Sequence, residues 1–336
     1  MKMSFKRLIK PLVLTAITGF ASAQASAFCW WWDNAYTKTK YPIVLAHGAF
    51  GFNNALGIVD YWYEIADGLR ACSGAKVYTT QVSPSNSTEY RGEQLLSQVQ
   101  QILAATGAKK VNLIGHSMGG LDIRYVAEVR PDLVASVTSV ASPHKGTQIF
   151  EQFAPFLNDP NALGGLVQAM IPVFNDALET VYELLTGTKV GSVDMQAAVN
   201  AQRPSVQAAW NVNYSRGVPA SACGEGNAVE NINGHNVRYY SWTGDNPVPW
   251  TSSLNPLAVV DLAMNTLMGI LGAAQNVPGD GFVEKCSAHL GDVLRDDYNW
   301  NHLDEINQLF GITADFETDP VGVFKDHANR LKKLGL

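Results

Sequence analysis

Short apolar runs rich in valine and isoleucine alternate along this 336-residue chain with segments in which apolar residues recur at helical spacing. The runs occupy residues 43–46, 76–82, 111–114, 134–141 and 237–242. Short runs of this composition are typical of buried strands. Helical spacing is clear at 95–103 and at 123–130, where Pro131 ends the second pattern. The alternation predicts a mostly parallel sheet with helices on both faces, an α/β fold.

Two longer apolar patterns lie outside this alternation. Residues 163–185 show helical periodicity that Pro172 interrupts, and residues 257–274 are almost entirely apolar. The second pattern has the length of a membrane span, but Asp261 and two glycines within it argue against an integral membrane helix. We therefore expect two buried helices or, as the alternative, a mobile cover over a site that binds fatty material.

The first 27 residues have the features of a secretory signal peptide. Four basic residues precede the apolar stretch 12–23, and small residues follow at 25–27. Cleavage after Ala27 is predicted, with Ala23 as the alternative. Removing four basic and no acidic residues changes the formal net charge from −6 to −10. An exported, acidic protein is expected, and this charge disfavours nucleic acids and anionic headgroups as partners.

The remaining 309 residues, 28–336, are long enough for one large domain, and no shift of composition marks a linker. Four cysteines are an even number, which can pair completely in an oxidising compartment. No CxxC or Cys/His spacing suggests a zinc site.

The stretch "IGHSMGG" places Gly115, Ser117 and Gly119 between a predicted strand and a predicted helix. A strand that turns sharply into a helix strains the corner residue and crowds its neighbours, so glycine is required two positions away on each side. The corner exposes the serine hydroxyl at a helix N-terminus, where free N–H groups favour a developing oxyanion. This context predicts a nucleophile elbow; a structural glycine turn is the alternative.

A nucleophilic serine needs a base, and the base needs an acid to orient it. In this kind of fold the acid and then the histidine follow the serine along the chain. His302, between an Asn/Trp cluster and a helix start, is the favoured base, with His235 and His289 as alternatives. Asp245 and Asp280 both follow extended runs and precede turns. Sequence reasoning barely separates the two aspartates, and it leans toward Asp280.

A second oxyanion donor is expected from the loop "HGAFG" after the first inner strand. In this loop the Ala49 N–H can face Ser117, and the Met118 N–H supplies the other donor. An ordinary glycine turn is the alternative.

Five segments together resemble the secreted bacterial true lipases of the Pseudomonas and Burkholderia type, family I. The segments are "YPIVLAHGAFGF", "RGEQLL", "NLIGHSMGGLDIRYVAEVRPDLVASVTSVASPHKGT", "GDGFVEKCS" and "NHLDEINQLFG". The resemblance covers nearly the whole chain after the signal peptide. It implies an α/β-hydrolase fold with a helical lid, inserted at about residues 150–222, and hydrolysis of triacylglycerols at an oil–water interface.

The resemblance also implies roles for particular residues. The family's catalytic serine, aspartate and histidine fall on Ser117, Asp280 and His302, and its oxyanion donors fall on Ala49 and Met118. Its single disulfide falls on Cys223 and Cys286, which would brace the loop that carries the aspartate. Cys29 and Cys72 are then left to each other, a pairing outside the family pattern.

A structural calcium ion is a further implication. The family's site would here use the Asp304 carboxylate and the main-chain carbonyls of Gln308 and Ile312. The family's upstream aspartate aligns with Asn255, which brings no charge, so Asp261 is the alternative fourth ligand.

Members of this family generally need a dedicated membrane-anchored foldase and leave the cell in two steps through the periplasm, so both are expected here. Two other enzyme activities fit the same residues: a short-chain carboxylesterase and a lipid acyltransferase. A catalytically inactive hydrolase fold that serves as a binding module is the alternative from another class.

Overall fold

Seven strands form the central sheet of this protein, whose computed structural model describes residues 35–336 except 56–58, 159–162, 251–257 and 309. The strand order is β4-β1-β5-β6-β8-β7, and β9 pairs with β8 on the same edge as β7. The strands are β1 (Ile43–Ala46), β4 (Val77–Thr79), β5 (Val111–His116), β6 (Val134–Val140), β7 (Val229–Ile232), β8 (His235–Gly244) and β9 (Asp292–Tyr298). All pairs are parallel except β7 with β8.

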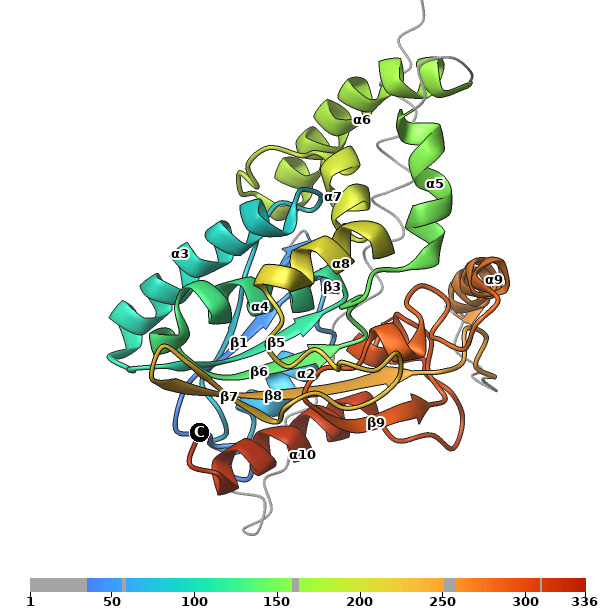
Figure 1. The fold of residues 1–336 in the computed structure, drawn as a ribbon. Helices are drawn as coiled ribbons and strands as arrows, with labels where there is room; N and C mark the ends of the chain where they lie inside the picture. The colour runs from blue at the N-terminus through green and yellow to red at the C-terminus, as the bar shows by residue number, and fades with distance from the viewer. Residues whose placement is uncertain (1–34, 56–58, 159–162, 251–257, 309) are drawn as a thin grey trace, which may run out of the picture.

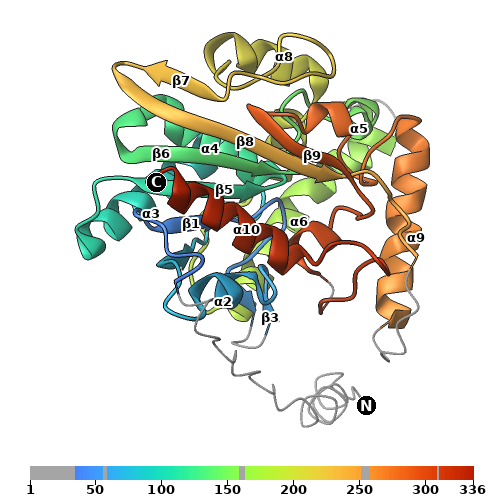
Figure 2. The ribbon, with the colours of Figure 1, turned by 90° about the horizontal axis from the view of Figure 1, so that it is seen from below.

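Helices cover both faces of this sheet (Figures 1 and 2). The helices are α2 (Ile65–Arg70), α3 (Thr88–Thr106), α4 (Met118–Val129), α5 (Gln148–Asn158), α6 (Leu163–Thr186), α7 (Met195–Ala201), α8 (Pro204–Asn213), α9 (Ala258–Gln275) and α10 (Pro320–Lys333). A small hairpin, β2 (Asn54–Ala55) with β3 (Val59–Asp60), follows β1. The predicted α/β-hydrolase fold with a mostly parallel sheet is confirmed.

Alternation along the strands divides the core into two layers. Val44 and Ala46 pack with α3 and α4, while Ile43 and Leu45 pack with α2 and α10 on the opposite face. Successive side chains of a strand point to opposite faces, so a strand covered on both sides is apolar throughout. This arrangement explains why β1, β5 and β6 were recognisable in the sequence as continuous apolar runs.

The predicted runs 76–82 and 237–242 fall on β4 and β8, whereas β7 and β9 were not predicted, because they do not have this pattern. β9 reads "DVLRDDY" and is only partly buried over most of its length, since it lies at the sheet edge. β7 alternates exposed and partly buried residues and forms a hairpin with β8 through a turn at Asn233 and Gly234. Edge strands carry polar residues, so their sequences resemble loops.

Four helices, α5 to α8, lie between β6 and β7 in the chain, in the segment predicted as the lid insertion. The expected interruption at Pro172 was wrong, because α6 runs continuously from Leu163 to Thr186 with this proline inside it. Pro172 is exposed. Water can therefore replace the main-chain hydrogen bond that the proline ring removes.

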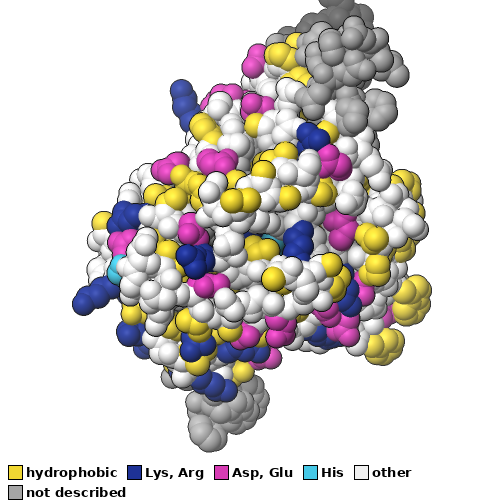
Figure 3. Space-filling view, viewed as in Figure 1, with side chains coloured by type: hydrophobic (Ala, Val, Ile, Leu, Met, Phe, Trp, Pro, Cys, Tyr) yellow, Lys and Arg dark blue, Asp and Glu magenta, His cyan; other side chains and the backbone are white. Residues whose placement is uncertain are grey.

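Both long apolar helices expose large hydrophobic side chains to solvent. On α6, Met170, Val173, Val181 and Leu184 are 47–76% exposed, and on α9, Leu262, Leu267 and Ile270 are 44–63% exposed. Figure 3 shows hydrophobic side chains gathered at the side of the molecule where α9 lies. The expectation that these helices are simply buried was therefore wrong for one face of each. Among the described helices, none has the combination of length and hydropathy that crossing a membrane requires.

Among the buried histidines with lowered pKa values, His47 and His327 are neutral at physiological pH. Burial and the charge of Arg91 lower the pKa of His47 to about 3, and burial lowers that of His327 to about 3. Between pH 6.5 and 3 the unfolded chain therefore binds protons that the folded chain does not bind. The free energy of unfolding must fall as the pH falls through this window.

We expect the protein to lose about 2 kcal/mol of stability per buried histidine between pH 7.5 and pH 5. Urea unfolding at the two pH values measures the loss. In a His327→Gln variant, the difference between the two pH values should shrink by about 2 kcal/mol, whatever the change in absolute stability. An undiminished difference would show that His327 is not held neutral.

Candidate active site

Ser117 occupies the corner between β5 and α4 and has an unusual backbone conformation. Its φ of 54° and ψ of −129° lie outside the regions that a serine ordinarily adopts. The Ser117 N–H donates to the Val140 carbonyl at 2.9 Å, which holds the corner against β6. The side chain makes no capping bond to α4, so the hydroxyl is not used to stabilise the helix. This strained corner is the geometry that the sequence predicted for a nucleophile elbow.

Glycine at positions 115 and 119 is a requirement of close approach. A Cβ on Gly115 would lie 2.5 Å from the Gly119 carbonyl carbon, and a Cβ on Gly119 would lie 2.7 Å from the His47 main-chain oxygen. Any larger residue would push the helix away from β5 or from the loop after β1.

His302 and Asp280 meet beside this corner. His302 Nδ1 is 2.7 Å from Asp280 Oδ2, and the His302 N–H donates to the Asp280 carbonyl at 3.0 Å. The other carboxylate oxygen accepts from the N–H groups of Phe282 and Val283 at 2.8 and 2.7 Å. Asp280 is fully buried and its oxygens are all occupied, so its carboxylate is placed to hold the proton of His302 on Nδ1.

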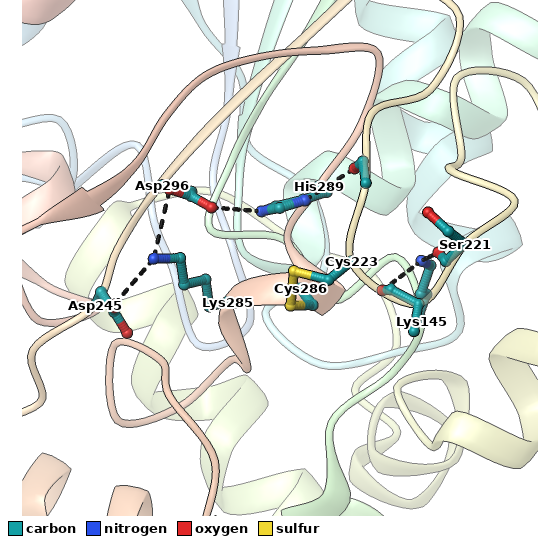
Figure 4. The surroundings of a disulfide bond; sticks show 10 residues. Lys145, Ser221, Cys223, Asp245, Lys285, Cys286, His289 and Asp296 are labelled. Atoms are coloured by element: carbon teal, nitrogen blue, oxygen red, sulfur yellow. Dashed lines mark hydrogen bonds and ion pairs between the residues drawn. A yellow bond between two sulfur atoms is a disulfide. The ribbon is translucent and has the colours of Figure 1, made fainter.

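Two rival candidates, Asp245 and His289, belong to another cluster, beside the disulfide (Figure 4). Asp245 pairs with Lys285 at 3.1 Å. His289 Nε2 lies 3.1 Å from Asp296, which Lys285 also contacts at 3.4 Å. These four side chains hold the segment around Cys286 together, so Asp245 and His289 are engaged in structural contacts. His235 begins β8, where it pairs with Ile232.

The residue before the serine brings His302 to the elbow. The rings of His116 and His302 have centroids 4.5 Å apart at an interplanar angle of 41°. The His302 ring also stacks on Phe282, with centroids 5.1 Å apart. His302 is only 6% exposed. The imidazole thus contacts two other rings, one of which belongs to the residue before Ser117.

The loop after β1 approaches Ser117 closely. A Cβ on Gly48 would lie 2.8 Å from Ser117 Cβ, so only glycine allows this approach. Within the described part of the chain, the N–H groups of Ala49 and Met118 have no hydrogen-bond acceptor. One donor follows Ser117 in the chain and the other follows Gly48, and two such N–H groups are suited to binding an oxyanion.

A buried arginine anchors this loop. Arg91 Nη2 donates to the His47 carbonyl at 2.8 Å and pairs with Asp122 at 2.7 Å, with both side chains fully buried. Arg91 also donates to the Ser83 carbonyl. The guanidinium therefore ties the loop after β1 to α3 and α4.

We expect Asp122→Ala to lower the free energy of unfolding by about 3 kcal/mol, because it leaves the Arg91 charge buried without its counter-ion. Asp132→Ala is the matched control, since its pair with Arg130 has both side chains 39% exposed; the expected change there is below about 1 kcal/mol. Urea unfolding of both variants decides the matter, and equal effects would contradict the anchoring role.

Glu305 is a second buried carboxyl near the pair. Its side chain is 0% exposed, accepts from the Gly244 N–H, and has one oxygen 3.8 Å from His116 Nε2. Burial, with the nearby Asp280 charge, raises the pKa of Glu305 well above its ordinary value. This shift favours the neutral form of Glu305 and disfavours a second negative charge beside Asp280.

The predicted disulfide between Cys223 and Cys286 is confirmed, and it joins the segment after α8 to the segment after Asp280. Lys145 reinforces this junction, because its Nζ donates to the main-chain oxygens of Ser221 and Ala222 (Figure 4). Cys72 is also disulfide-bonded. Its expected partner Cys29 lies outside the described residues, as does the predicted signal peptide.

The expected calcium ligands lie in one turn after His302. Asp304 is 1% exposed and accepts from the Asn301 N–H at 2.9 Å. No N–H or O–H of the described residues donates to the main-chain carbonyls of Gln308 and Ile312, although both residues are buried. One carboxylate and two carbonyls without donors form the hard oxygen set that calcium prefers, so these residues fit the ion.

The expected fourth ligand is not defined. Asn255 lies outside the described residues. Asp261 belongs to α9, but the described structure does not include its side chain.

Comparison with known proteins places this geometry in a family. Residues 41–260 match the family model for the alpha/beta hydrolase fold. A triacylglycerol lipase of Vibrio cholerae is 47% identical over 332 residues, which cover 97% of this chain and 99% of that protein. The chain belongs to the triacylglycerol lipase family. A triacylglycerol lipase of Burkholderia plantarii is 38% identical to this lipase-family chain over 327 residues. The alignment covers 90% of this chain and 89% of that protein.

Solved structures agree on the fold of this lipase-family protein. Staphylococcus hyicus lipase superimposes with a TM-score of 0.56 at 16% identity, over 88% of this chain and 97% of that one. At this level of identity the likeness concerns the fold alone.

Sequence reasoning missed several residues around the site. Arg91 stands in "RGEQLL", which contributed to the resemblance but carried no role of its own. Tyr61, His116 and Glu305 come from three separate parts of the chain, and no spacing in the sequence connects them. Their common signal is burial of a polar group, which becomes visible only after folding.

Proposed function

We propose that this protein is a secreted triacylglycerol lipase that hydrolyses carboxylic esters through an acyl-enzyme on Ser117. The observation that carries the proposal is the buried His302–Asp280 pair beside a serine in elbow geometry. Family membership supports the ester chemistry, and the exposed apolar faces of α6 and α9 support a fatty substrate.

The reaction begins when the Ser117 hydroxyl oxygen bonds to the ester carbonyl carbon while His302 Nε2 takes the hydroxyl proton. Asp280 stabilises the imidazolium that forms. The ring then gives the same proton to the departing alcohol oxygen as the carbon–oxygen bond breaks, which leaves the acyl-enzyme. Water repeats the sequence in place of serine, and the fatty acid departs.

The tetrahedral oxyanion is expected to bind the Ala49 and Met118 N–H groups. These donors need no rearrangement, because they have no other acceptor among the described residues. One such donor typically contributes about 3 kcal/mol to transition-state stabilisation.

Comparing substrates tests the proposed function. Hydrolysis of olive oil at a rate similar to that of tributyrin supports a lipase, whereas hydrolysis of tributyrin alone identifies a short-chain carboxylesterase. Adding an alcohol acceptor and measuring new ester detects acyltransfer. Absence of both hydrolysis and transfer, together with no phosphonate adduct, would make the protein a binding module.

The helices of the insertion are proposed to form the lid. Tyr182 of α6 donates through its hydroxyl to the Phe50 carbonyl, one residue from Ala49. A helix that contacts the oxyanion loop while exposing apolar residues is well placed to cover the site and to bind lipid. If activity on emulsified triolein shows no gain above the solubility limit, and a crosslink that pins α6 to this loop leaves turnover unchanged, the lid role fails.

Calcium is proposed as a structural ion held by the Asp304 carboxylate and the main-chain oxygens of Gln308 and Ile312, with Asn255 or Asp261 as a further ligand. The ion would supply positive charge that holds this turn in place. The turn begins two residues after His302, so its rigidity is transmitted to the base.

We expect calcium to raise thermal stability, by about 2.7 kcal/mol when its concentration is one hundred times the dissociation constant. Melting temperature with calcium and with chelator measures this effect. Asp304→Asn should abolish the difference, whereas Asp245→Asn, at a carboxylate outside the turn, should preserve it. An equal response in the two variants would place the ion elsewhere.

Export through the periplasm and assistance by a membrane-anchored foldase are also proposed, on the basis of the family resemblance. Refolding from urea with and without the periplasmic domain of a lipase foldase tests the second part. Full recovery of activity without it would remove the need for such a partner.

A further inference from the structure

A chain of hydrogen bonds connects the loop after β1 with His302 through the side chains of Tyr61 and His116. The Gly48 N–H donates to the Tyr61 hydroxyl oxygen at 2.9 Å. The Tyr61 hydroxyl is 2.7 Å from His116 Nδ1, and His116 Nε2 is 3.0 Å from the His302 main-chain oxygen. Both side chains are buried, with Tyr61 9% and His116 1% exposed.

The two ends of this chain determine its proton positions. A main-chain N–H can only donate, so the Tyr61 oxygen accepts from Gly48, and His116 Nδ1 is the acceptor that the described contacts offer to the Tyr61 proton. A carbonyl oxygen can only accept, so His116 donates from Nε2 to His302. His116 therefore carries one proton and is neutral. Burial, together with the charge of His302, lowers the pKa of His116 well below its ordinary value, in agreement with this assignment.

Each end of the chain holds a group that the reaction needs in place. Gly48 is the residue before Ala49, and it approaches Ser117 so closely that no side chain fits. His302 has both main-chain polar groups engaged, its N–H by Asp280 and its carbonyl by His116. The oxyanion loop and the base are thus connected through the two residues Tyr61 and His116.

We propose that Tyr61 and His116 are positioning residues that set the Ala49 N–H and the His302 ring relative to Ser117. The proposal rests on the proposed function of the site. Both residues act through their neighbours, so their effect is expected on the transition state. A small displacement of the donor or the base weakens contacts to the reacting atoms, whereas the acyl chain binds to other surfaces.

Tyr61→Phe tests the proposal, because it removes one oxygen and breaks both bonds at the middle of the chain. We expect kcat for tributyrin to fall about 10- to 100-fold with KM within about twofold. A boronic acid that forms a tetrahedral adduct on Ser117 should bind weaker by the same factor. A long-chain alcohol, which occupies the acyl site without an adduct, should bind unchanged.

Tyr125→Phe is the matched control. It also removes a tyrosine hydroxyl, one that donates to Glu93 at 2.6 Å within the core between α3 and α4. Its kcat and boronic acid affinity should stay within about twofold of the parent protein, since surface and core hydrogen bonds far from the site do not position reacting groups. A merely structural role for Tyr61 would make the two variants alike.

Double variants test the connection itself. His116→Leu breaks both ring contacts, whereas His116→Gln keeps a donor that can reach His302. We expect Gln to recover part of the loss in kcat, and Tyr61→Phe combined with His116→Leu to be no slower than His116→Leu alone.

Several outcomes would overturn the proposal. Multiplicative losses in the double variant would show that Tyr61 and His116 act separately, and an unchanged boronic acid affinity in Tyr61→Phe would show that neither oxyanion donor nor base has moved. Failure of the proposed function gives a different result, because the parent protein would then neither hydrolyse tributyrin nor bind the boronic acid.

Discussion

Ser117→Ala is expected to lower kcat for ester hydrolysis by about 10⁶-fold, the scale of loss when a serine hydrolase loses its nucleophile. The reason is that no other hydroxyl can occupy the corner between β5 and α4, where the strained backbone presents the side chain to the base. Stopped assays at high enzyme concentration measure the residual rate. Mass spectrometry after phosphonate treatment should find one adduct in the parent protein and none in the variant.

Ser142→Ala is the control for this prediction. Ser142 is fully buried next to the elbow, but its hydroxyl donates to the Val140 carbonyl at 3.2 Å. This variant should keep the phosphonate adduct and lose less than about tenfold in kcat, since it removes only a structural hydrogen bond. An adduct that persists in Ser117→Ala would place the nucleophile elsewhere.

His302→Ala is expected to lower kcat about as much as Ser117→Ala, by 10⁵- to about 10⁶-fold, because the serine then has no base. The two changes should not add: the double variant is expected to be as slow as either single one, since each removes the same proton transfer. Initial rates on tributyrin for the three variants measure this.

The matched control is His289→Ala. His289 is buried to a similar extent and also pairs with an aspartate, Asp296, but it lies in the cluster beside the disulfide. Its removal should lower stability and leave kcat within about tenfold. If His289→Ala proved as slow as His302→Ala, the choice of base would be wrong.

Much of the fold could be predicted because its inner strands are covered on both faces. That burial makes β1, β5 and β6 apolar along their whole length, and the strands and helices follow in the order typical of a parallel sheet. Where one side of an element faces solvent, the pattern fades. The edge strand β9 is polar, so the sequence did not predict it. Pro172 is exposed within α6, so the predicted break in that helix does not occur.

The candidate site divides in the same manner. The elbow around Ser117 could be read from local sequence, because the glycines two positions away are demanded by its own backbone. The choice between Asp245 and Asp280 could not be made from local sequence, because both residues follow extended runs and precede turns. Residue patterns gave only a preference for Asp280. The resemblance to a family pointed to Asp280, and the structure shows why: Asp245 is engaged by Lys285 while Asp280 holds His302.

The sequence by itself determined the sharp corner at Ser117, the parallel order of the inner strands and the acidic, even-cysteine composition of the chain, because each depends on residues that are neighbours along the backbone. Only the tertiary structure decided which loops meet at that corner. Gly48, Tyr61, His116 and His302 are brought together by hydrogen bonds across long separations. Such hydrogen bonds require no particular spacing along the sequence, so no sequence pattern predicts a contact between residues that lie far apart in the chain.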